Sequence, residues 1–192
     1  MTTRSAALTE NNAIESALRT VSIERNGLAA LETALSGELG DAFAKAVDVI
    51  GNITGRLIIT GVGKSGHIGA KLAATFASTG TPAFFVHAAE ANHGDLGMIG
   101  GNDVVLAISK GGESAELRSI INYTRRFAIP LIALTCAKGG SLAKASDIVL
   151  LMPDEEEACP HRLAPTTSTL MQLALGDALA IALLEARKFT AG

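Results

Sequence analysis

The 192-residue sequence predicts a single α/β domain built on a doubly wound, five-stranded parallel sheet. Two observations indicate this class. Short, unbroken apolar runs recur between turns, as is typical of strands covered on both faces. Between them lie segments whose apolar residues recur every three or four positions, as in amphipathic helices. We expect a flavodoxin-like strand order, 2-1-3-4-5, with a helical hairpin before the sheet and a long helix after it.

The hairpin is expected over residues 1–54, as part of the same domain as the sheet. Ile14, Leu18 and Val21 begin an apolar stripe that predicts a helix over about residues 6–35. Gly37 is a plausible stop for this helix, and a second one is expected over residues 38–50. A hairpin in this position often supplies a surface between subunits.

Residues 55–192 are expected to form the sheet and the helices that cover it. The predicted strands are residues 57–60, 83–86, 104–108, 131–135 and 148–152. The predicted helices are residues 68–78, 114–127, 141–145 and 167–188.

Composition excludes several classes of protein. A hydrophobic share of 48% with 18% charged residues excludes intrinsic disorder, and a net charge of −3 argues against a nucleic-acid partner. The unbroken apolar runs are shorter than the ~18 residues of a membrane span, so no membrane partner is expected. No apolar signal core lies in residues 1–12, and Cys136 and Cys159 form no disulfide framework, which together predict a cytoplasmic protein. The low charge favours a homo-oligomer, although an alanine-rich chain gives the same count.

Residues 61–66, Gly-Val-Gly-Lys-Ser-Gly, lie between the first strand and the next helix. They match a dinucleotide-binding fingerprint, but no acidic residue ends the second strand to hold a ribose. A Walker A loop is excluded because Ile58 stands where a glycine is required. NAD and ATP are therefore both disfavoured, and no cofactor is expected. The remaining interpretation is an anion site made by helix-terminal amides beside Lys64.

Residues 109–114, Ser-Lys-Gly-Gly-Glu-Ser, follow the third strand in the same way. Alone, each loop is more typical of a tight strand–helix turn. In the predicted order, however, strands one and three are neighbours at the switch point of the sheet, where ligands bind. Together the two loops predict a site for a small phosphorylated ligand.

Further segments complete a recognisable pattern: residues 61–69, 74–82, 93–98, 112–116, 157–160, 163–169 and 176–180. With these segments the chain, from about residue 55 to 190, resembles the SIS (sugar isomerase) domain of the arabinose-5-phosphate isomerase group. The resemblance implies interconversion of ribulose 5-phosphate and arabinose 5-phosphate, without a cofactor, in a homotetramer whose active sites lie near subunit contacts.

The resemblance also implies roles for individual residues. Lys64, His93 and Glu116 match the proposed catalytic groups. The residues expected around the phosphate, with the glycines and the lysine of the two loops included, are Gly63, Ser65, Ser109, Lys110, Gly111, Ser114, Thr167, Ser168 and Thr169.

The sequence departs from the family pattern in two places. The family usually has Ser-Asn-Ser-Gly-Glu-Ser where residues 109–114 stand, so one hydroxyl is replaced and a cation, Lys110, is added. The family also continues with a His-Pro-Gly-Gly segment, which holds a further active-site histidine, and with paired CBS modules. Neither is among these 192 residues. A sugar-phosphate-binding protein without catalysis, or an isomerase of another pentose or hexose phosphate, therefore remain alternatives.

The chemistry of these residues suits an enediol mechanism. Glu116 can act as the base, although a glutamate in the first turn of a helix is also favoured by the helix dipole. His93 can move a proton or open the sugar ring, although most loop histidines are only surface residues. Lys64 can neutralise the phosphate or the enediolate, and His67 is a weaker candidate for the same crevice. No metal is expected, because residues 155–161 show no recurring ligand spacing.

Overall fold

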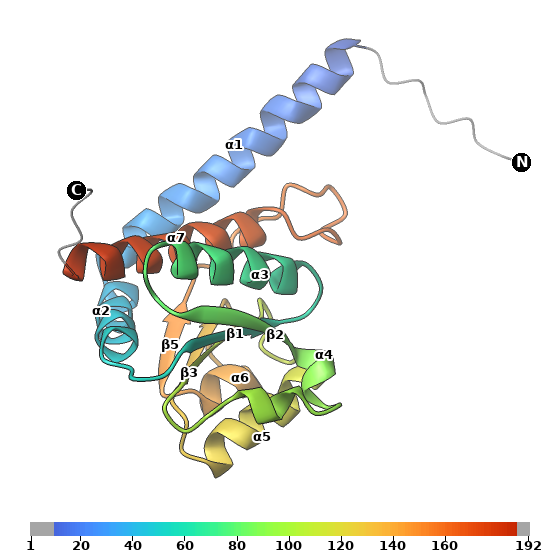
Figure 1. Ribbon diagram of the computed structural model, residues 1–192. Helices are drawn as coiled ribbons and strands as arrows, with labels where there is room; N and C mark the ends of the chain where they lie inside the picture. The colour runs from blue at the N-terminus through green and yellow to red at the C-terminus, as the bar shows by residue number, and fades with distance from the viewer. Residues whose placement is uncertain (1–9, 188–192) are drawn as a thin grey trace, which may run out of the picture.

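The computed structural model describes residues 10–187 and shows the predicted doubly wound architecture (Figure 1). Five parallel strands form one sheet in the order β2-β1-β3-β4-β5, which confirms the predicted order. Every strand begins at the predicted residue. The strands are β1 (Leu57–Gly61), β2 (Ala83–His87), β3 (Val104–Ile108), β4 (Leu131–Thr135) and β5 (Ile148–Leu151).

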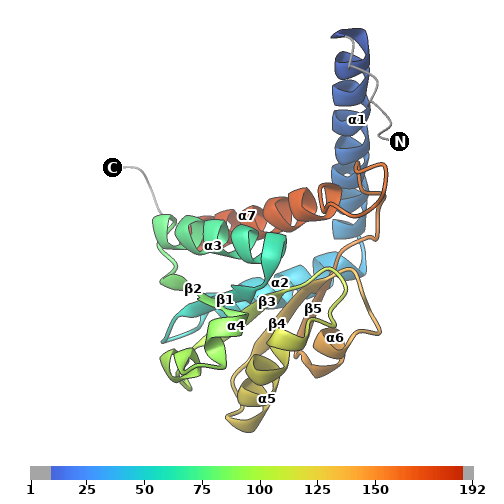
Figure 2. The same cartoon turned by 90° about the vertical axis from the view of Figure 1, so that its right-hand side faces the viewer.

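Helices cover both faces of the sheet (Figure 2). One face carries α2 (Glu38–Gly51), α3 (Gly63–Ser78) and α7 (Thr167–Ala186). The other carries α4 (Ala88–Ala91), α5 (Arg118–Arg126) and α6 (Ser141–Ala145), with two 3-10 turns, η1 (Asp95–Met98) and η2 (Ala115–Leu117).

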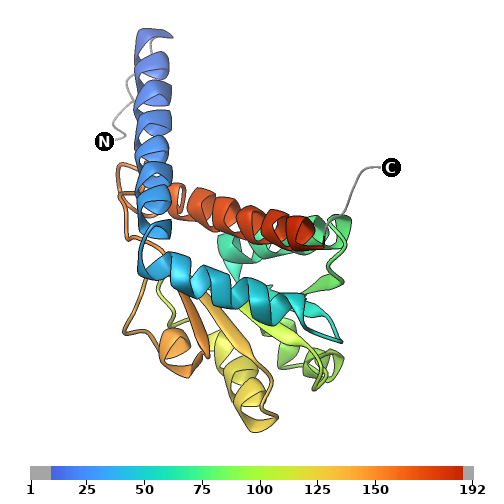
Figure 3. The same ribbon diagram turned by 90° about the vertical axis from the view of Figure 1, so that its left-hand side faces the viewer.

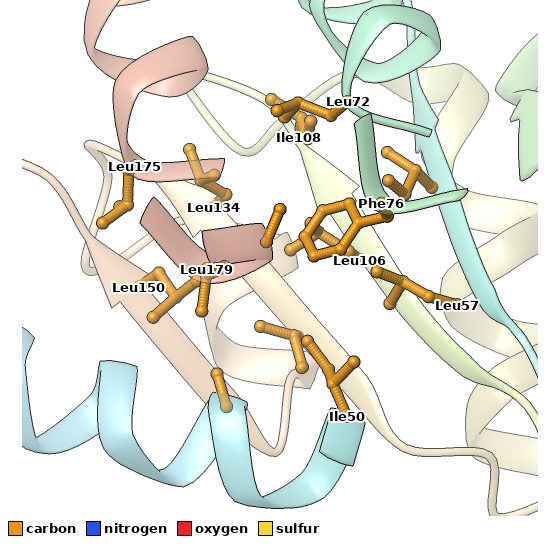
Figure 4. Packing of buried hydrophobic residues seen from close by; sticks show 14 of the residues in the cluster. Ile50, Leu57, Leu72, Phe76, Leu106, Ile108, Leu134, Leu150, Leu175 and Leu179 are labelled. Atoms are coloured by element: carbon orange, nitrogen blue, oxygen red, sulfur yellow. The ribbon is translucent and has the colours of Figure 1, made fainter. Parts of the chain in front are cut away.

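The two apolar layers follow from the alternation of side chains along each strand. In β1, Leu57 and Ile59 enter the layer beneath α3 and α7, whereas Ile58 enters the layer toward α4 and α5. Figure 4 shows the first layer, in which Phe76 of α3 and Leu179 of α7 meet strand residues. Every residue of β1 and of β3 is buried, which explains why these strands contain almost no polar residue.

Helix α1 (Glu10–Leu35) lies partly outside the body of the protein (Figures 1 and 3). Its second half packs against α2 and α7, and Leu31 is buried there. Its first half projects, and Ile14, Leu18 and Val21 are 54%, 66% and 63% exposed. Residues 6–9, where this helix was expected to begin, and residue 188, the expected end of α7, lie outside the described residues.

The helices differ from the predictions in two places. Helix α3 begins at Gly63, five residues before the predicted start, so the glycine-rich loop is itself the first helical turn. Gly63 has a φ of +56°, a conformation that side-chain-bearing residues rarely adopt. The helix predicted over residues 114–127 is divided into η2 and α5. The short elements α4 and η1 were not predicted, because they are too short to show a period.

Helix α7 is the one helix within residues 10–187 that is long and apolar enough to cross a membrane. Half of its most apolar stretch is buried inside the protein. Leu175 and Leu179 pack into the layer beneath α3 (Figure 4). A core helix of a globular domain meets the same criterion, and α7 occupies such a position.

Candidate functional site

The two glycine-containing loops leave neighbouring strands at the same edge of the sheet. Strands β1 and β3 pair in parallel, with Gly61 opposite Ile108. Because both strands end there, the turn that opens α3 and the loop over residues 109–114 start side by side. This is the switch point at which the sequence placed the site.

The first loop offers groups that no other part of the described protein engages. Gly66 N donates to Val62 O at 3.1 Å, which closes the first turn of α3. Lys64 is exposed and Ser65 is half-buried. Within residues 10–187, neither side chain makes a hydrogen bond or an ion pair. A cation, a hydroxyl and helix-terminal amides are thus available to an anion from solution.

The second loop is held by its own hydroxyls. Ser109 Oγ accepts from Gly112 N at 3.1 Å and lies 3.2 Å from Ser114 Oγ. Glu113 fixes the loop to the start of α6, because its carboxylate accepts from Ser141 N and Ser141 Oγ, each at 2.7 Å. These hydrogen bonds lower the pKa of Glu113. The predicted phosphate ligands Ser109 and Ser114 therefore lie together, whereas Gly111 is exposed at the tip of the loop.

The side chain of Lys110 points toward two carboxylates. Its Nζ lies 2.9 Å from Glu157 Oε1 and 3.4 Å from Asp154 Oδ1. Burial alone would lower the pKa of Lys110, but the hydrogen bond and charge of Glu157, together with Asp154, raise it. The predicted role of Lys110 in binding the phosphate stays a prediction.

Glu157 is a residue beside the candidate site whose contacts the sequence did not predict. Its Oε2 accepts from Thr166 N at 2.8 Å and from Ser168 N at 3.2 Å, so this carboxylate caps α7. Burial alone would raise its pKa, but hydrogen bonds from Ser168, Thr166 and Lys110 lower it to about 2. The sequence signals were its place in the family-like segment 157–160 and an acidic residue shortly before a serine- and threonine-rich helix start.

The hydroxyls at the start of α7 are mostly turned inward. Thr167 and Ser168 are buried, and Thr169 Oγ1 donates to Thr166 O at 2.8 Å. In the described part of the chain, Thr167 Oγ1 and both polar atoms of the Gln172 side chain are buried without a hydrogen-bond partner. The predicted contact of Thr167, Ser168 and Thr169 with the phosphate stays a prediction.

Helices α3 and α7 run in the same direction and bring their first turns together (Figure 2). Lys71 Nζ and Asp177 Oδ1 are 2.5 Å apart, and Leu72 lies against Gly176. About two and a half turns earlier, the two helices begin at the edge where β1 and β3 end. The first turn of α7 is thus a third wall beside the two loops.

The other two catalytic candidates follow β2 and β3 at the same edge of the sheet. His93 follows α4, and Glu116 lies in η2, which packs against α4. Both side chains are exposed, and within residues 10–187 neither has a hydrogen-bond or ion-pair partner. His67, on the first turns of α3, is exposed as well. The structure therefore places Lys64 in the first turn of α3, His93 after α4 and Glu116 in η2, around one sheet edge and with no hydrogen bond or ion pair among their side chains within residues 10–187.

The acidic segment over residues 154–157 borders a cavity of about 330 Å³, lined also by Lys110 and Arg162. Glu156 Oε1 lies 3.8 Å from Arg162, so this part of the segment is paired with a cation. Among the described residues, no group of three or more histidine, cysteine, aspartate or glutamate side chains is placed to hold a metal ion.

Comparison with known proteins identifies several relatives. Arabinose 5-phosphate isomerase KdsD of Pseudomonas aeruginosa is 51% identical over 178 residues, 93% of this chain and 53% of the relative. KdsD of Salmonella typhi is 52% identical over 88% of this chain and 50% of the relative. This chain thus spans about half the length of the curated relatives it matches.

Among solved structures, the protein c3406 of E. coli CFT073, in complex with arabinose 5-phosphate, has a TM-score of 0.87 and 41% identity, and the match covers 95% of each chain. The SIS domain family matches residues 53–182, more than half of the sequence. These findings confirm the resemblance drawn from the motifs: the chain belongs to the SIS domain family.

Proposed function

We propose that this protein is a sugar-phosphate isomerase that interconverts arabinose 5-phosphate and ribulose 5-phosphate. The similarity to c3406, whose structure holds arabinose 5-phosphate and which this chain matches over 95% of its length, supports this substrate. The KdsD relatives carry the same activity in their names. The observation that carries the proposal is the set of unpartnered side chains Lys64, Ser65, His93 and Glu116, which follow β1, β2 and β3 at one edge of the sheet, within the described residues 10–187.

The proposed reaction moves one proton between neighbouring carbons. Glu116 takes the proton from C2 of the open-chain aldose, and the electron pair of that C–H bond forms the C1–C2 double bond of a cis-enediol. The aldehyde oxygen gains a proton as the C2 hydroxyl loses one. Return of the carbon-bound proton to C1 then gives the ketose. The sugar is oxidised at C2 and reduced at C1, so the sum needs no external oxidant.

The remaining groups have distinct proposed tasks. His93 moves protons between the sugar oxygens and opens the furanose ring. Lys64 neutralises the phosphate or the developing enediolate, because a cation stabilises charge best where water is partly excluded. The phosphate group itself is proposed to bind the amides and hydroxyls of the two loops, at Gly63, Ser65, Ser109, Gly111 and Ser114, and the hydroxyls of Thr167, Ser168 and Thr169.

Solvent-exchange kinetics test the proposal directly. Arabinose 5-phosphate is incubated with the protein in D₂O, and proton NMR follows deuterium at C2 of the aldose and C1 of the ketose. Glu116→Gln is expected to lower kcat by ~10²- to 10⁴-fold, because it removes the base and leaves the shape unchanged. The control is Glu32→Gln, which alters an exposed glutamate of α1.

Two results would contradict the proposal. Binding of the sugar phosphate without exchange at either carbon would indicate a binding protein without catalysis. Faster turnover of a hexose 6-phosphate or another pentose phosphate would assign a different substrate to the same site.

We also propose that the protein acts in the cytoplasm as a homo-oligomer, a tetramer by analogy with its family, without a nucleic-acid or membrane partner. The exposed apolar stripe of α1 supports self-association, because Ile14, Leu18 and Val21 lie on one face. Residues 1–54 and 55–192 are proposed to form one domain, since α1 packs on α7 and α2 packs on β5.

A further inference from the structure

Lys110 connects the second loop to the first turn of α7. Its carbonyl oxygen accepts from Thr135 Oγ1 and from Cys136 N, each at 3.0 Å, so the backbone at this residue is fixed to the end of β4. Its ammonium group is 2.9 Å from Glu157 Oε1. A single side chain therefore spans from the sheet to the acidic segment that precedes α7.

Glu157 continues this connection into the helix. Its second oxygen accepts from Thr166 N, Thr166 Oγ1 and Ser168 N, at 2.8, 3.2 and 3.2 Å. Thr166 Oγ1 in turn accepts from Ala158 N at 2.9 Å, which closes the turn. The donors to this carboxylate come from the second loop, through Lys110 Nζ, and from the start of α7, through Thr166 and Ser168. Both elements belong to the proposed phosphate site.

The carboxylates around Lys110 argue against an ammonium group that is free to bind the phosphate. Its ammonium lies between Glu157 and Asp154, and the Glu157 side chain is only 6% exposed. Moving the ammonium to a phosphate would leave a nearly buried carboxylate without its cation, which is costly. The lowered pKa of Glu157 keeps it ionised at neutral pH, so the pairing persists there.

We propose that Lys110 is a positioning residue: acting through Glu157, it holds the first turn of α7 against the second loop and so fixes the spacing of the phosphate-binding groups on both. This inference rests on the proposed function. It assigns to the cation that departs from the family pattern a task other than direct contact with the ligand.

A thermodynamic cycle tests the inference, with KM and kcat for arabinose 5-phosphate as readouts. Lys110→Met is expected to raise KM by about threefold or more with a smaller change in kcat, since it loosens the site without removing a reacting group. In Lys110→Met/Glu157→Gln, the neutral amide needs no cation and its oxygen can still cap α7. The double variant is therefore expected to regain part of the lost affinity.

Two further variants sharpen the comparison. Lys110→Arg can still pair with Glu157 and is expected to lose less affinity than Lys110→Met. Lys138→Met is the matched control, because it removes a lysine whose ion pair with Glu38, at 3.8 Å, is exposed on both sides. Lys138→Met is expected to leave KM unchanged.

The outcomes separate the two proposals. The effect of Lys110→Met on affinity is measured in the wild-type protein and in the Glu157→Gln variant. An equal loss in both would make Lys110 a direct phosphate ligand and would overturn the inference. A wild-type protein without turnover would contradict the proposed function instead. In that case, hydrogen exchange of the backbone amides, measured without ligand, tests the positioning role. Lys110→Met should exchange the amides of Thr166 and Ser168 faster than Lys138→Met does. Unchanged exchange would overturn the positioning role.

Discussion

The two cysteines show how surroundings set the behaviour of one residue type. Burial raises the pKa of Cys136 to about 11, and its Sγ donates to Pro153 O at 3.5 Å. Cys159 lies in the turn before α7, where backbone N–H groups, that of Ala164 foremost, lower its pKa. Since the thiolate is the reactive form, the two side chains differ in reactivity as well.

Iodoacetamide is therefore expected to alkylate Cys159 at least about tenfold faster than Cys136 in the native protein at pH 8. Peptide mass spectrometry of timed samples measures both rates. Equal rates in the native state would contradict this expectation, and equal rates after denaturation serve as the control.

Glu157 is expected to make stability depend on acidity. Its pKa in the folded protein, about 2, is below the unfolded value near 4.5, so the carboxylate stabilises the fold above pH 4.5. This contribution, up to about 3 kcal/mol, is lost as the pH falls toward 2. Denaturant unfolding of wild type and Glu157→Gln at several pH values should show a difference that is largest near pH 7 and shrinks below pH 4.5. A constant difference from pH 7 to 3 would refute the assignment.

At the scale of elements, the contact between α3 and α7 depends on a glycine. A Cβ at Gly176 would lie within 2.5 Å of both Leu72 Cδ atoms, and Leu72 is fully buried. Gly176→Ala is therefore expected to force the helices apart and to cost ~1–3 kcal/mol of unfolding free energy.

Gly51→Ala is the matched control for this helix contact. A Cβ there would lie 3.6 Å from Leu183 Cδ2, an ordinary contact, so alanine should be neutral or stabilise α2 by up to ~1 kcal/mol. Thermal unfolding of both variants measures the difference. If Gly176→Ala is as stable as Gly51→Ala, the two helices are not as tightly packed as described.

The strands were predictable because their signal is local. An unbroken apolar run such as Val104–Ile108 needs no knowledge of the rest of the chain, and the position of the two loops follows from parallel pairing. The role of Glu157 was not predictable, because it depends on Lys110, which lies 47 residues away in the sequence. The sequence shows that Thr167 carries a hydroxyl but not where the hydroxyl points. Its direction depends on packing against α1, where the methyl group of Thr167 lies against Gly27.

At the scale of the whole molecule, the projecting half of α1 suggests a partner surface. Leu18 is 66% exposed on a helix that elsewhere packs into the core. Leu18→Glu is expected to shift the protein from an oligomer to smaller species in light scattering coupled to size exclusion, because burying this side chain is worth ~1.5–3 kcal/mol. Arg19→Glu adds the same carboxylate one residue away and should leave the mass unchanged. A monomeric wild-type protein would contradict the proposed assembly.

The carboxylate that caps α7 also affects how an incoming anion is recognised. The positive end of this helix already faces an internal negative charge, so its dipole offers little attraction to solutes. Lys64 and the amides that open α3 then supply most of the electrostatic attraction, and capture of the ligand should respond only weakly to ionic strength. Discrimination among solutes of equal charge consequently rests on the directions of short-range donors, and inorganic sulfate should be a poor competitor.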